Sequence, residues 1–154
     1  MTPAIDQLTH LGVHHQLHEY THDSKAASYG MEAAEKLGVT AQRVFKTLVV
    51  NVGHKLLAVA VLPVDQQLNL KLMAKALDVK KVVMADPFMV SRSSGYVLGG
   101  VSPVGQKRAL TTVIDASAKE QQSIYVSGGR RGLEIELSAS DLAMVTHGVF
   151  AIIT

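Results

Sequence analysis

Short runs of aliphatic and β-branched residues recur along the chain, and residues typical of turns separate them. The clearest run is VFKTLVVNV, residues 44–52, which Gly53 separates from a second run, KLLAVAVLP, residues 55–63. This pattern predicts a β-hairpin, and the nearly unbroken apolar character of the second run indicates a strand that is buried on both faces. Shorter strands are predicted over residues 14–20, 80–85, 110–115, 123–127 and 133–137.

Capping residues predict short helices between these strands. Thr2-Pro3 and Asp86-Pro87 each combine an N-capping side chain with a proline that suits the first helical position. Further helices are predicted to begin at Ser28 or Gly30, at Asn69 and at Ser138, and Thr40 can cap one additional turn. Hairpins mixed with short helices favour the α+β class over repeated βαβ units, and so many short strands suit a curved or barrel-like sheet.

The composition indicates one folded domain that spans residues 1–154. Apolar residues make up 47% of the chain and charged residues 18%, which excludes a disordered protein. There is no cysteine, so disulfides, thiolate metal sites and a cysteine nucleophile are excluded. The longest apolar stretch, residues 56–64, is too short to cross a membrane, and the N-terminus lacks the pattern of a signal peptide. We therefore expect a soluble, cytoplasmic protein without a membrane partner.

The charge is distributed unevenly, although the formal net charge is only +2. Residues 71–131 carry 10 basic and 4 acidic side chains, whereas residues 132–154 carry 3 acidic and no basic ones. A basic segment of this kind is typical of a surface that binds a polyanion such as nucleic acid. A solvated, lysine-rich surface would give the same pattern, so charge alone leaves both interpretations open.

Lys46 is the first candidate functional residue, because it lies inside the apolar run VFKTLVV. Lysine is rarely buried without a partner. One interpretation is an edge strand, where an inward-pointing lysine discourages aggregation. The other is a cation at the floor of a pocket, where it would bind a phosphate or carboxylate or polarise a carbonyl group.

Two glycine-rich segments are further candidates. GYVLGGVSPVG, residues 95–105, can aim consecutive backbone N–H groups at an oxyanion, or it can be a long turn between a helix and a strand. In SGGRRG, residues 127–132, the two glycines suit a hairpin turn. Arg130 and Arg131 follow these glycines, and they either meet phosphates or form a solvated tip.

The histidines and the remaining catalytic motifs give weaker signals. Five histidines crowd the N-terminal segment, namely His10, His14, His15, His18 and His22. They form no H-E-x-x-H motif, and the sequence contains no G-x-S-x-G elbow and no evident pair of acid–base carboxylates. We therefore predict no metal site and no cofactor, and no protein side chain is an obvious nucleophile.

Five segments occur in an order that resembles a known family. They are HEYTHD (18–23), VFKTLVV (44–50), KKVVMADP (80–87), GYVLGGVSPVGQKR (95–108) and IYVSGGRRGLEIEL (124–137). Together they make the chain similar, over essentially its whole length, to the YbaK family of bacterial aminoacyl-tRNA deacylases. The resemblance implies a single α+β domain with a mixed, barrel-like β-sheet flanked by short helices. It also implies a trans-editing hydrolase that cleaves the aminoacyl ester of mischarged tRNA, in the first place Cys-tRNA(Pro).

The resemblance further implies which residues form the site. The family's essential lysine corresponds to Lys46, and its G-x-x-x-P loop corresponds to residues 99–103, where Gly100 and Val101 would supply catalytic backbone contacts. The implied substrate-binding residues are Tyr20, Tyr29, Thr47, Gly99, Ser102, Pro103, Ser127, Gly128 and Gly129. One departure is Glu134, where related chains carry Asp, so the resemblance assigns this carboxylate no role.

The implied partners are mischarged tRNA and prolyl-tRNA synthetase. Lys107, Arg108, Arg130 and Arg131 would bind the tRNA acceptor end, and the low net charge predicts weak affinity without help from the synthetase in a transient ternary complex. Because the chain offers no evident nucleophile, we expect substrate-assisted catalysis, in which the thiol of a cysteinyl substrate or its ribose hydroxyl does the chemistry. Attack by water stays open as an alternative. Two alternatives are an Ala-tRNA(Pro) or broader-specificity deacylase, and a non-catalytic module that binds aminoacyl-tRNA or nucleotide.

Overall fold

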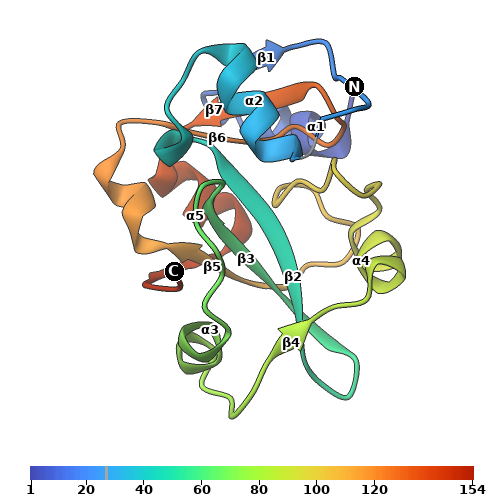
Figure 1. The fold of residues 1–154 in the computed structure, drawn as a ribbon, viewed down its shortest axis with the longest axis vertical. Coiled ribbons are helices and arrows are strands. Elements are labelled where there is room, and N and C mark those ends of the chain that lie inside the picture. The colour runs from blue at the N-terminus through green and yellow to red at the C-terminus, as the bar shows by residue number, and fades with distance from the viewer. Residues whose placement is uncertain (27) are drawn as a thin grey trace.

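The strands form two β-sheets in the computed structural model, which describes residues 1–26 and 28–154. The larger sheet has five strands in the order β4-β2-β3-β5-β8 (Figure 1). They are β2 (Phe45–Gly53), β3 (Leu56–Pro63), β4 (Val83–Met84), β5 (Thr111–Asp115) and β8 (Val149–Ala151). β2 pairs antiparallel with β3 and β4, whereas β5 is parallel to β3 and β8, so this sheet is mixed.

The smaller sheet is antiparallel and contains three strands in the order β1-β7-β6. They are β1 (Gln16–Glu19), β6 (Ile124–Ser127) and β7 (Leu133–Leu137). An isolated bridge between Val44 and Tyr125 joins the start of β2 to β6, so the two sheets meet there. The expected α+β class is confirmed. The barrel-like part of the expectation needs a correction, because the strands of the described residues form two open sheets.

The helices begin where capping residues predict them. They are α1 (Pro3–His10), α2 (Tyr29–Leu37), α3 (Leu70–Ala76), α4 (Pro87–Ser94) and α5 (Ala139–Thr146). The preceding residues each accept a hydrogen bond from a backbone N–H of the first turn, namely Thr2, Ser28, Asn69, Asp86 and Ser138. Gly38 and Gly95 end α2 and α4 in the left-handed conformation, with φ values of 68° and 81°.

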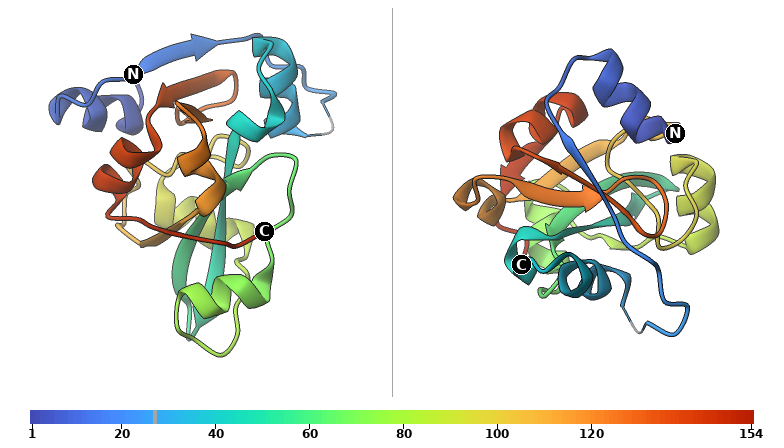
Figure 2. Two further views of the ribbon diagram at one scale, coloured as in Figure 1. Left: turned by 90° about the vertical axis from the view of Figure 1, so that its left-hand side faces the viewer. Right: turned by 90° about the horizontal axis from the view of Figure 1, so that it is seen from above.

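The β2–β3 hairpin is the frame that carries the site. His54 and Lys55 form its turn with φ values of 51° and 63°, and β3 is buried from Ala58 to its end, as its sequence predicts. Side chains of β3 alternate between two hydrophobic clusters. Val59 and Val61 pack with α1, α5 and the smaller sheet, whereas their neighbours pack against α3 on the other face. Figure 2 shows α3 at the opposite end of the molecule from β1.

Two details differ from the sequence expectations. The strand expected over residues 80–85 is reduced to β4: Val83 and Met84 pair with β2, and the N–H of Ala85 adds one hydrogen bond to the carbonyl oxygen of Val49. The pattern also misses β8 and a 3₁₀ helix, η2 (Ala116–Glu120), whereas the turn expected after Thr40 is observed as η1 (Ala41–Arg43). No helix within residues 1–26 and 28–154 has the length and apolar character needed to span a membrane.

Candidate active site

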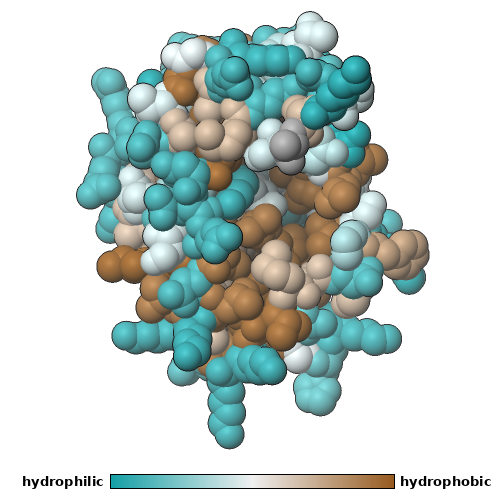
Figure 3. All heavy atoms as spheres, viewed as in Figure 1, coloured by the Kyte–Doolittle hydropathy of each residue, from teal (hydrophilic) through white to brown (hydrophobic). Residues whose placement is uncertain are grey.

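A cavity of about 480 Å³ opens beside β2, near the point where the two sheets meet. Its walls come from the start of α2, the segment that links β4 to α4, the loop of residues 98–101 and the turn between β6 and β7. Hydrophobic side chains gather over β2, β4 and α4 on the face that Figure 3 shows. The volume lies within the range of about 300–1,000 Å³ that is typical of small-molecule sites.

Lys46 of β2 is a half-buried cation in this cavity. It lies opposite Leu62 of β3 and lines the cavity. Burial lowers the pKa of its ammonium group, and attraction from Asp65 opposes this shift only in part. Its Nζ atom makes no ion pair with any residue that the structure describes. This geometry favours the pocket interpretation of Lys46 over the edge-strand interpretation.

Thr47 contributes a hydroxyl group that has no partner among the described residues. The Oγ1 atom is buried, and the residue lines the same cavity as its neighbour Lys46. A buried polar group without a hydrogen bond is costly, so such a group is commonly satisfied by a ligand or by water. Because this oxygen is closed off from solvent, a substrate atom could reach it only after the neighbouring side chains move.

Glu134 of β7 places a buried carboxyl group in the cavity wall. The residue is 7% exposed and lies between His18 of β1 and Ser127 of β6. Burial raises its pKa to about 8, so the carboxyl is largely neutral at pH 7. Nearby, burial first and the charge of Glu134 second raise the pKa of Tyr20 to about 12. At neutral pH the cavity is therefore lined by the cations Lys46, Arg130 and Arg131, and its buried carboxyl is largely uncharged.

Arg131 holds the glycine-rich loop against the cavity. Its Nη2 and Nε atoms donate to the carbonyl oxygen of Leu98 at 2.7 and 3.1 Å, and its guanidinium carbon lies 4.7 Å from the centroid of the Tyr29 ring. Gly99 passes between these groups with φ of 83°, and a Cβ atom there would come within 2.7 Å of both side chains. Only glycine fits this position, so its role is to permit close packing.

The two predicted oxyanion donors have different surroundings. Val101 lines the cavity, and its backbone N–H makes no hydrogen bond to the described part of the chain. Gly100 does not line the cavity, and its N–H already donates to the carbonyl oxygen of Val97 at 2.9 Å. A Cβ atom on Gly100 would lie 2.9 Å from the Cα atom of Arg130. The structure thus gives Gly100 a packing role and leaves Val101 as the available donor.

Several other predicted site residues support the cavity from behind. Ser102 is fully buried and accepts a hydrogen bond from the N–H of Val104. The N–H of Gly128 donates to the carbonyl oxygen of Leu133 at 2.8 Å. The predicted residues that line the cavity are Tyr20, Tyr29, Lys46, Thr47, Gly99, Val101, Ser127, Arg130 and Arg131. Those that do not line it are Gly100, Ser102, Pro103, Lys107, Arg108, Gly128 and Gly129.

A buried glutamate holds the segment that leads into α2. Glu32 accepts hydrogen bonds from the N–H of Asp23 at 2.7 Å and from His22 at 2.8 Å, and it forms an ion pair with Lys36 at 3.2 Å. Burial alone would raise its pKa, but these interactions together lower the pKa to about 2. The network therefore ties residues 22 and 23 to α2, close in sequence to Tyr20 and Tyr29, the two tyrosines that line the cavity.

The cavity wall from β4 to α4 was not assigned to the site by the sequence analysis. Met84, Ala85, Pro87 and Val90 line the cavity there. The segment KKVVMADP is one of those that resemble the family, and this was the available signal. Within residues 1–26 and 28–154, no group of three or more His, Asp or Glu side chains is arranged to hold a metal ion.

Comparisons with known proteins give a consistent result. Residues 24–144 match the family described as "Aminoacyl-tRNA editing domain". The protein EbsC of Enterococcus faecalis is 43% identical over 122 residues, which cover 79% of this chain and 74% of that protein. EbsC is named as a candidate Cys-tRNA(Pro)/Cys-tRNA(Cys) deacylase. The uncharacterised protein YwhH of Bacillus subtilis is 28% identical over 112 residues, 73% of this chain and 71% of that protein.

Solved structures share the fold over nearly the whole chain. A hypothetical protein, APE2540, has a TM-score of 0.87 and 27% identity, and the match covers 98% of each chain. A structure described as a candidate trans-editing enzyme for prolyl-tRNA synthetase has a TM-score of 0.85 and 21% identity, and the match covers 100% of this chain and 98% of that one. At this level of identity, the second likeness shows the fold alone.

Proposed function

The chain belongs to the aminoacyl-tRNA editing domain family and is an aminoacyl-tRNA deacylase that acts in trans on mischarged tRNA, and we propose that its preferred substrate is Cys-tRNA(Pro). The name of the E. faecalis relative supports this choice of substrate. We further propose that the protein acts in the cytoplasm, on tRNA released by prolyl-tRNA synthetase or held in a transient complex with it.

One observation supports the proposal more than any other. Two groups line the cavity: the ammonium group of Lys46, which has no ion-pair partner in the described chain, and the largely neutral carboxyl of Glu134. Hydrolysis of an ester develops negative charge on the carbonyl oxygen. A fixed cation and a free backbone N–H in an apolar cavity stabilise that charge more strongly than water does. Lys46 and the N–H of Val101 are the groups that we assign to this role.

The attacking group is the second part of the proposal. If the substrate is a cysteinyl ester, its own thiol can attack the carbonyl carbon. A C–S bond forms, the C–O bond to the ribose breaks, and the thiol proton passes to the ribose oxygen. Water then opens the cyclic thioester to give free cysteine. The cavity needs only to hold the thiol against the carbonyl, and such proximity is worth effective molarities of about 10⁵ M or more. The alternative is attack by a water molecule that the free ribose hydroxyl activates, which breaks the same C–O bond and releases the amino acid directly.

The test is a panel of charged tRNAs incubated with the purified protein, with loss of the ester as the signal. Cys-tRNA(Pro) should be hydrolysed fastest. Lys46→Ala should lower kcat/KM by roughly 100- to 1,000-fold, the usual effect of removing one such electrostatic group. Lys80→Ala, an exposed lysine outside the cavity, is the matched control and should keep the wild-type rate. Equal rates for the two variants would show that Lys46 is not part of the active site.

A further inference from the structure

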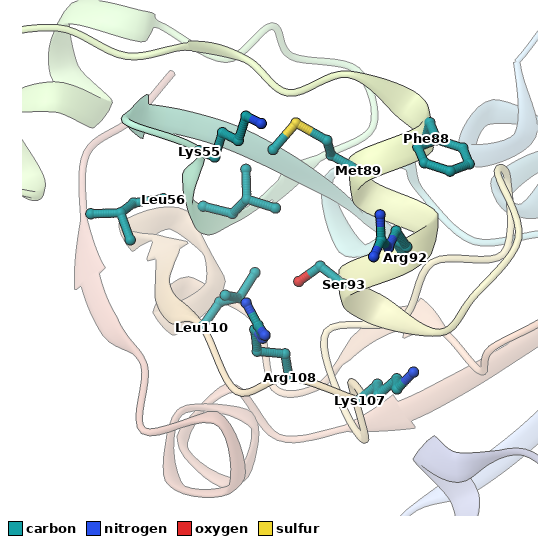
Figure 4. A pocket seen from close by; sticks show the side chains of 10 residues that line it. Lys55, Leu56, Phe88, Met89, Arg92, Ser93, Lys107, Arg108 and Leu110 are labelled. Carbon is teal, nitrogen blue, oxygen red and sulfur yellow. The ribbon is translucent and has the colours of Figure 1, made fainter.

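A second cavity, of about 860 Å³, lies beside α4. Three segments form it: the turn between β2 and β3, the outer face of α4, and residues 107–110 before β5. Figure 4 shows Arg92 and Ser93 on α4, with Arg108 facing them across the same space. No step of the proposed deacylation uses this cavity.

The charge of the second cavity has one sign. Lys55, Arg92, Lys107 and Arg108 line it, and no acidic residue does so within the described chain. All four side chains are exposed, and none of them forms an ion pair with a described residue. In contrast, Arg130 at the first cavity pairs with Glu19 at 3.4 Å. The cations of the second cavity are therefore available to an anionic partner.

The backbone holds these cations in a defined arrangement. The N–H groups of Lys107 and Arg108 donate to the carbonyl oxygens of Ser94 and Ser93 at 2.9 and 3.1 Å, so their segment is attached to the end of α4. Ser93 lines the cavity, and its buried Oγ atom has no hydrogen-bond partner among the described residues. This hydroxyl is a second sign of a ligand site, because such groups are commonly satisfied by a bound acceptor.

The two cavities lie on opposite faces of α4. Pro87 and Val90 line the first cavity, whereas Phe88, Met89, Arg92 and Ser93 line the second. With 100° between successive residues, these two sets point about 160° apart around the helix. The cavities are thus separated by roughly one helix diameter, about 10 Å. A chain molecule that enters one cavity with its end can reach the other with the units that follow.

We propose that the second cavity binds the phosphodiester backbone of the tRNA acceptor end, while the charged 3′ adenosine occupies the first cavity. This inference rests on the proposed function, because it takes the substrate of the first cavity to be an aminoacyl-tRNA. Arginine and lysine side chains are the usual phosphate partners. Phe88 is 70% exposed at the edge of the cavity and offers an aromatic face on which a base of the unpaired 3′ end can stack.

The first experiment measures binding of uncharged tRNA(Pro) over a series of salt concentrations, so it does not depend on deacylation. The variant Arg92→Glu/Arg108→Glu removes two phosphate contacts and should reduce the slope of log K against log salt by about 1.4–1.8. The control Lys71→Glu/Lys75→Glu makes the same change in net charge on the exposed face of α3, outside both cavities, and should keep the wild-type slope. Phe88→Ala should weaken binding without changing the slope, since stacking displaces no counterion.

A second experiment connects the cavity to the reaction. With Cys-tRNA(Pro) as substrate, the double arginine variant should raise KM more than it lowers kcat. With the short ester cysteinyl-adenosine, which carries no acceptor stem, the effect should be smaller. The milder variant Arg92→Ala/Arg108→Ala repeats both measurements, and circular dichroism confirms that each variant is folded. If no charged tRNA is hydrolysed by the wild type, the proposed function fails and the binding experiment still decides the inference.

Three results would overturn the inference. The first is a wild-type salt slope and affinity for the double arginine variant. The second is an equal loss for the α3 control, which would mean that only the overall charge matters. The third is an unchanged tRNA affinity together with a lost interaction with prolyl-tRNA synthetase, which would assign the second cavity to a protein partner instead.

Discussion

Glu134→Gln should make the protein more stable at neutral pH, and the gain should disappear in mild acid. Burial raises the pKa of Glu134 from 4.5 to about 8. A raised carboxyl pKa means that the folded protein favours the protonated form. The free energy of unfolding is therefore highest at low pH and falls as the pH rises from about 4.5 to about 8. Glutamine resembles the protonated carboxyl but does not titrate, so the variant avoids this loss.

The expected size follows from the linkage relation. Between pH 5 and pH 7 the unfolded chain ionises this carboxyl while the folded chain keeps it protonated, which lowers the free energy of unfolding of the wild type by about 2.5 kcal/mol. Water that enters the open cavity makes this value an upper limit. For a chain of this length, it corresponds to a difference in Tm of about 5–10 °C. Thermal unfolding of both proteins from pH 5 to pH 8 measures the effect.

A neighbouring glutamate provides the matched control. Glu136 lies two residues further along β7, where it accepts a hydrogen bond from Ser123 and pairs with His18 and Arg43 at 2.9 and 3.2 Å. The hydrogen bond from Ser123 is the main cause of its lowered pKa, although burial opposes the shift. Glu136→Gln should therefore destabilise the protein by a nearly constant amount between pH 5 and pH 7. Parallel stability curves for wild type and Glu134→Gln would refute the assignment of a buried, neutral Glu134.

Three further predictions concern the substrate, the loop and the α2 network. tRNA(Pro) charged with S-methylcysteine should be hydrolysed far more slowly than Cys-tRNA(Pro) in the same assay, and equal rates would exclude the substrate thiol as the attacking group. Gly100→Ala should destabilise the protein by about 1–3 kcal/mol in urea unfolding and lower kcat/KM, because the new Cβ atom would lie 2.9 Å from the Cα atom of Arg130. Unchanged stability and kcat/KM would contradict the close packing. Glu32→Gln should reduce the free energy of unfolding at pH 7. The difference from wild type should vanish as the pH falls from about 4.5 to about 2, because the pKa of Glu32 is lower in the folded than in the unfolded protein. A difference that persists at pH 2 would contradict the network.

Local signals made the helices and the hairpin predictable. A capping side chain followed by a proline or a helical run specifies where a helix begins, because the cap satisfies an N–H group of the first turn that has no partner within the helix. Thr2 and Asp86 act in this way. The sequence pattern predicts a strand over residues 80–85, which includes Lys80 and Lys81, whereas β4 contains Val83 and Met84 at the edge of the sheet. How many residues pair there depends on β2, which lies about thirty residues away in the sequence, and not on the local pattern.

The site was only half predictable, and Glu134 shows why. In the run LEIEL, alternation places Glu134 and Glu136 on the same face of the strand, where both would be expected to meet water. The structure instead buries Glu134 near Tyr20 and places Glu136 in a partly buried network with His18 and Arg43. The difference arises from β1 and from the segment before α2, which cover one end of β7. A single sequence does not show this tertiary arrangement, whereas Lys46 is visible because it interrupts an apolar strand.

The four cations predicted to bind tRNA form two pairs that differ in what they can do. Arg130 and Arg131 lie at the first cavity and are already engaged, one with Glu19 and the other with Leu98 and Tyr29. Arg131 holds the glycine-rich loop in place through Leu98, whereas the exposed ion pair of Arg130 with Glu19 joins the β6–β7 turn to β1. Lys107 and Arg108 lie on the other side of α4 and have no ion-pair partner among the described residues. If tRNA approached only over the first cavity, it would have to displace contacts that shape the site. Approach over α4 leaves those contacts intact and uses cations that are free, which is why we place the acceptor end there.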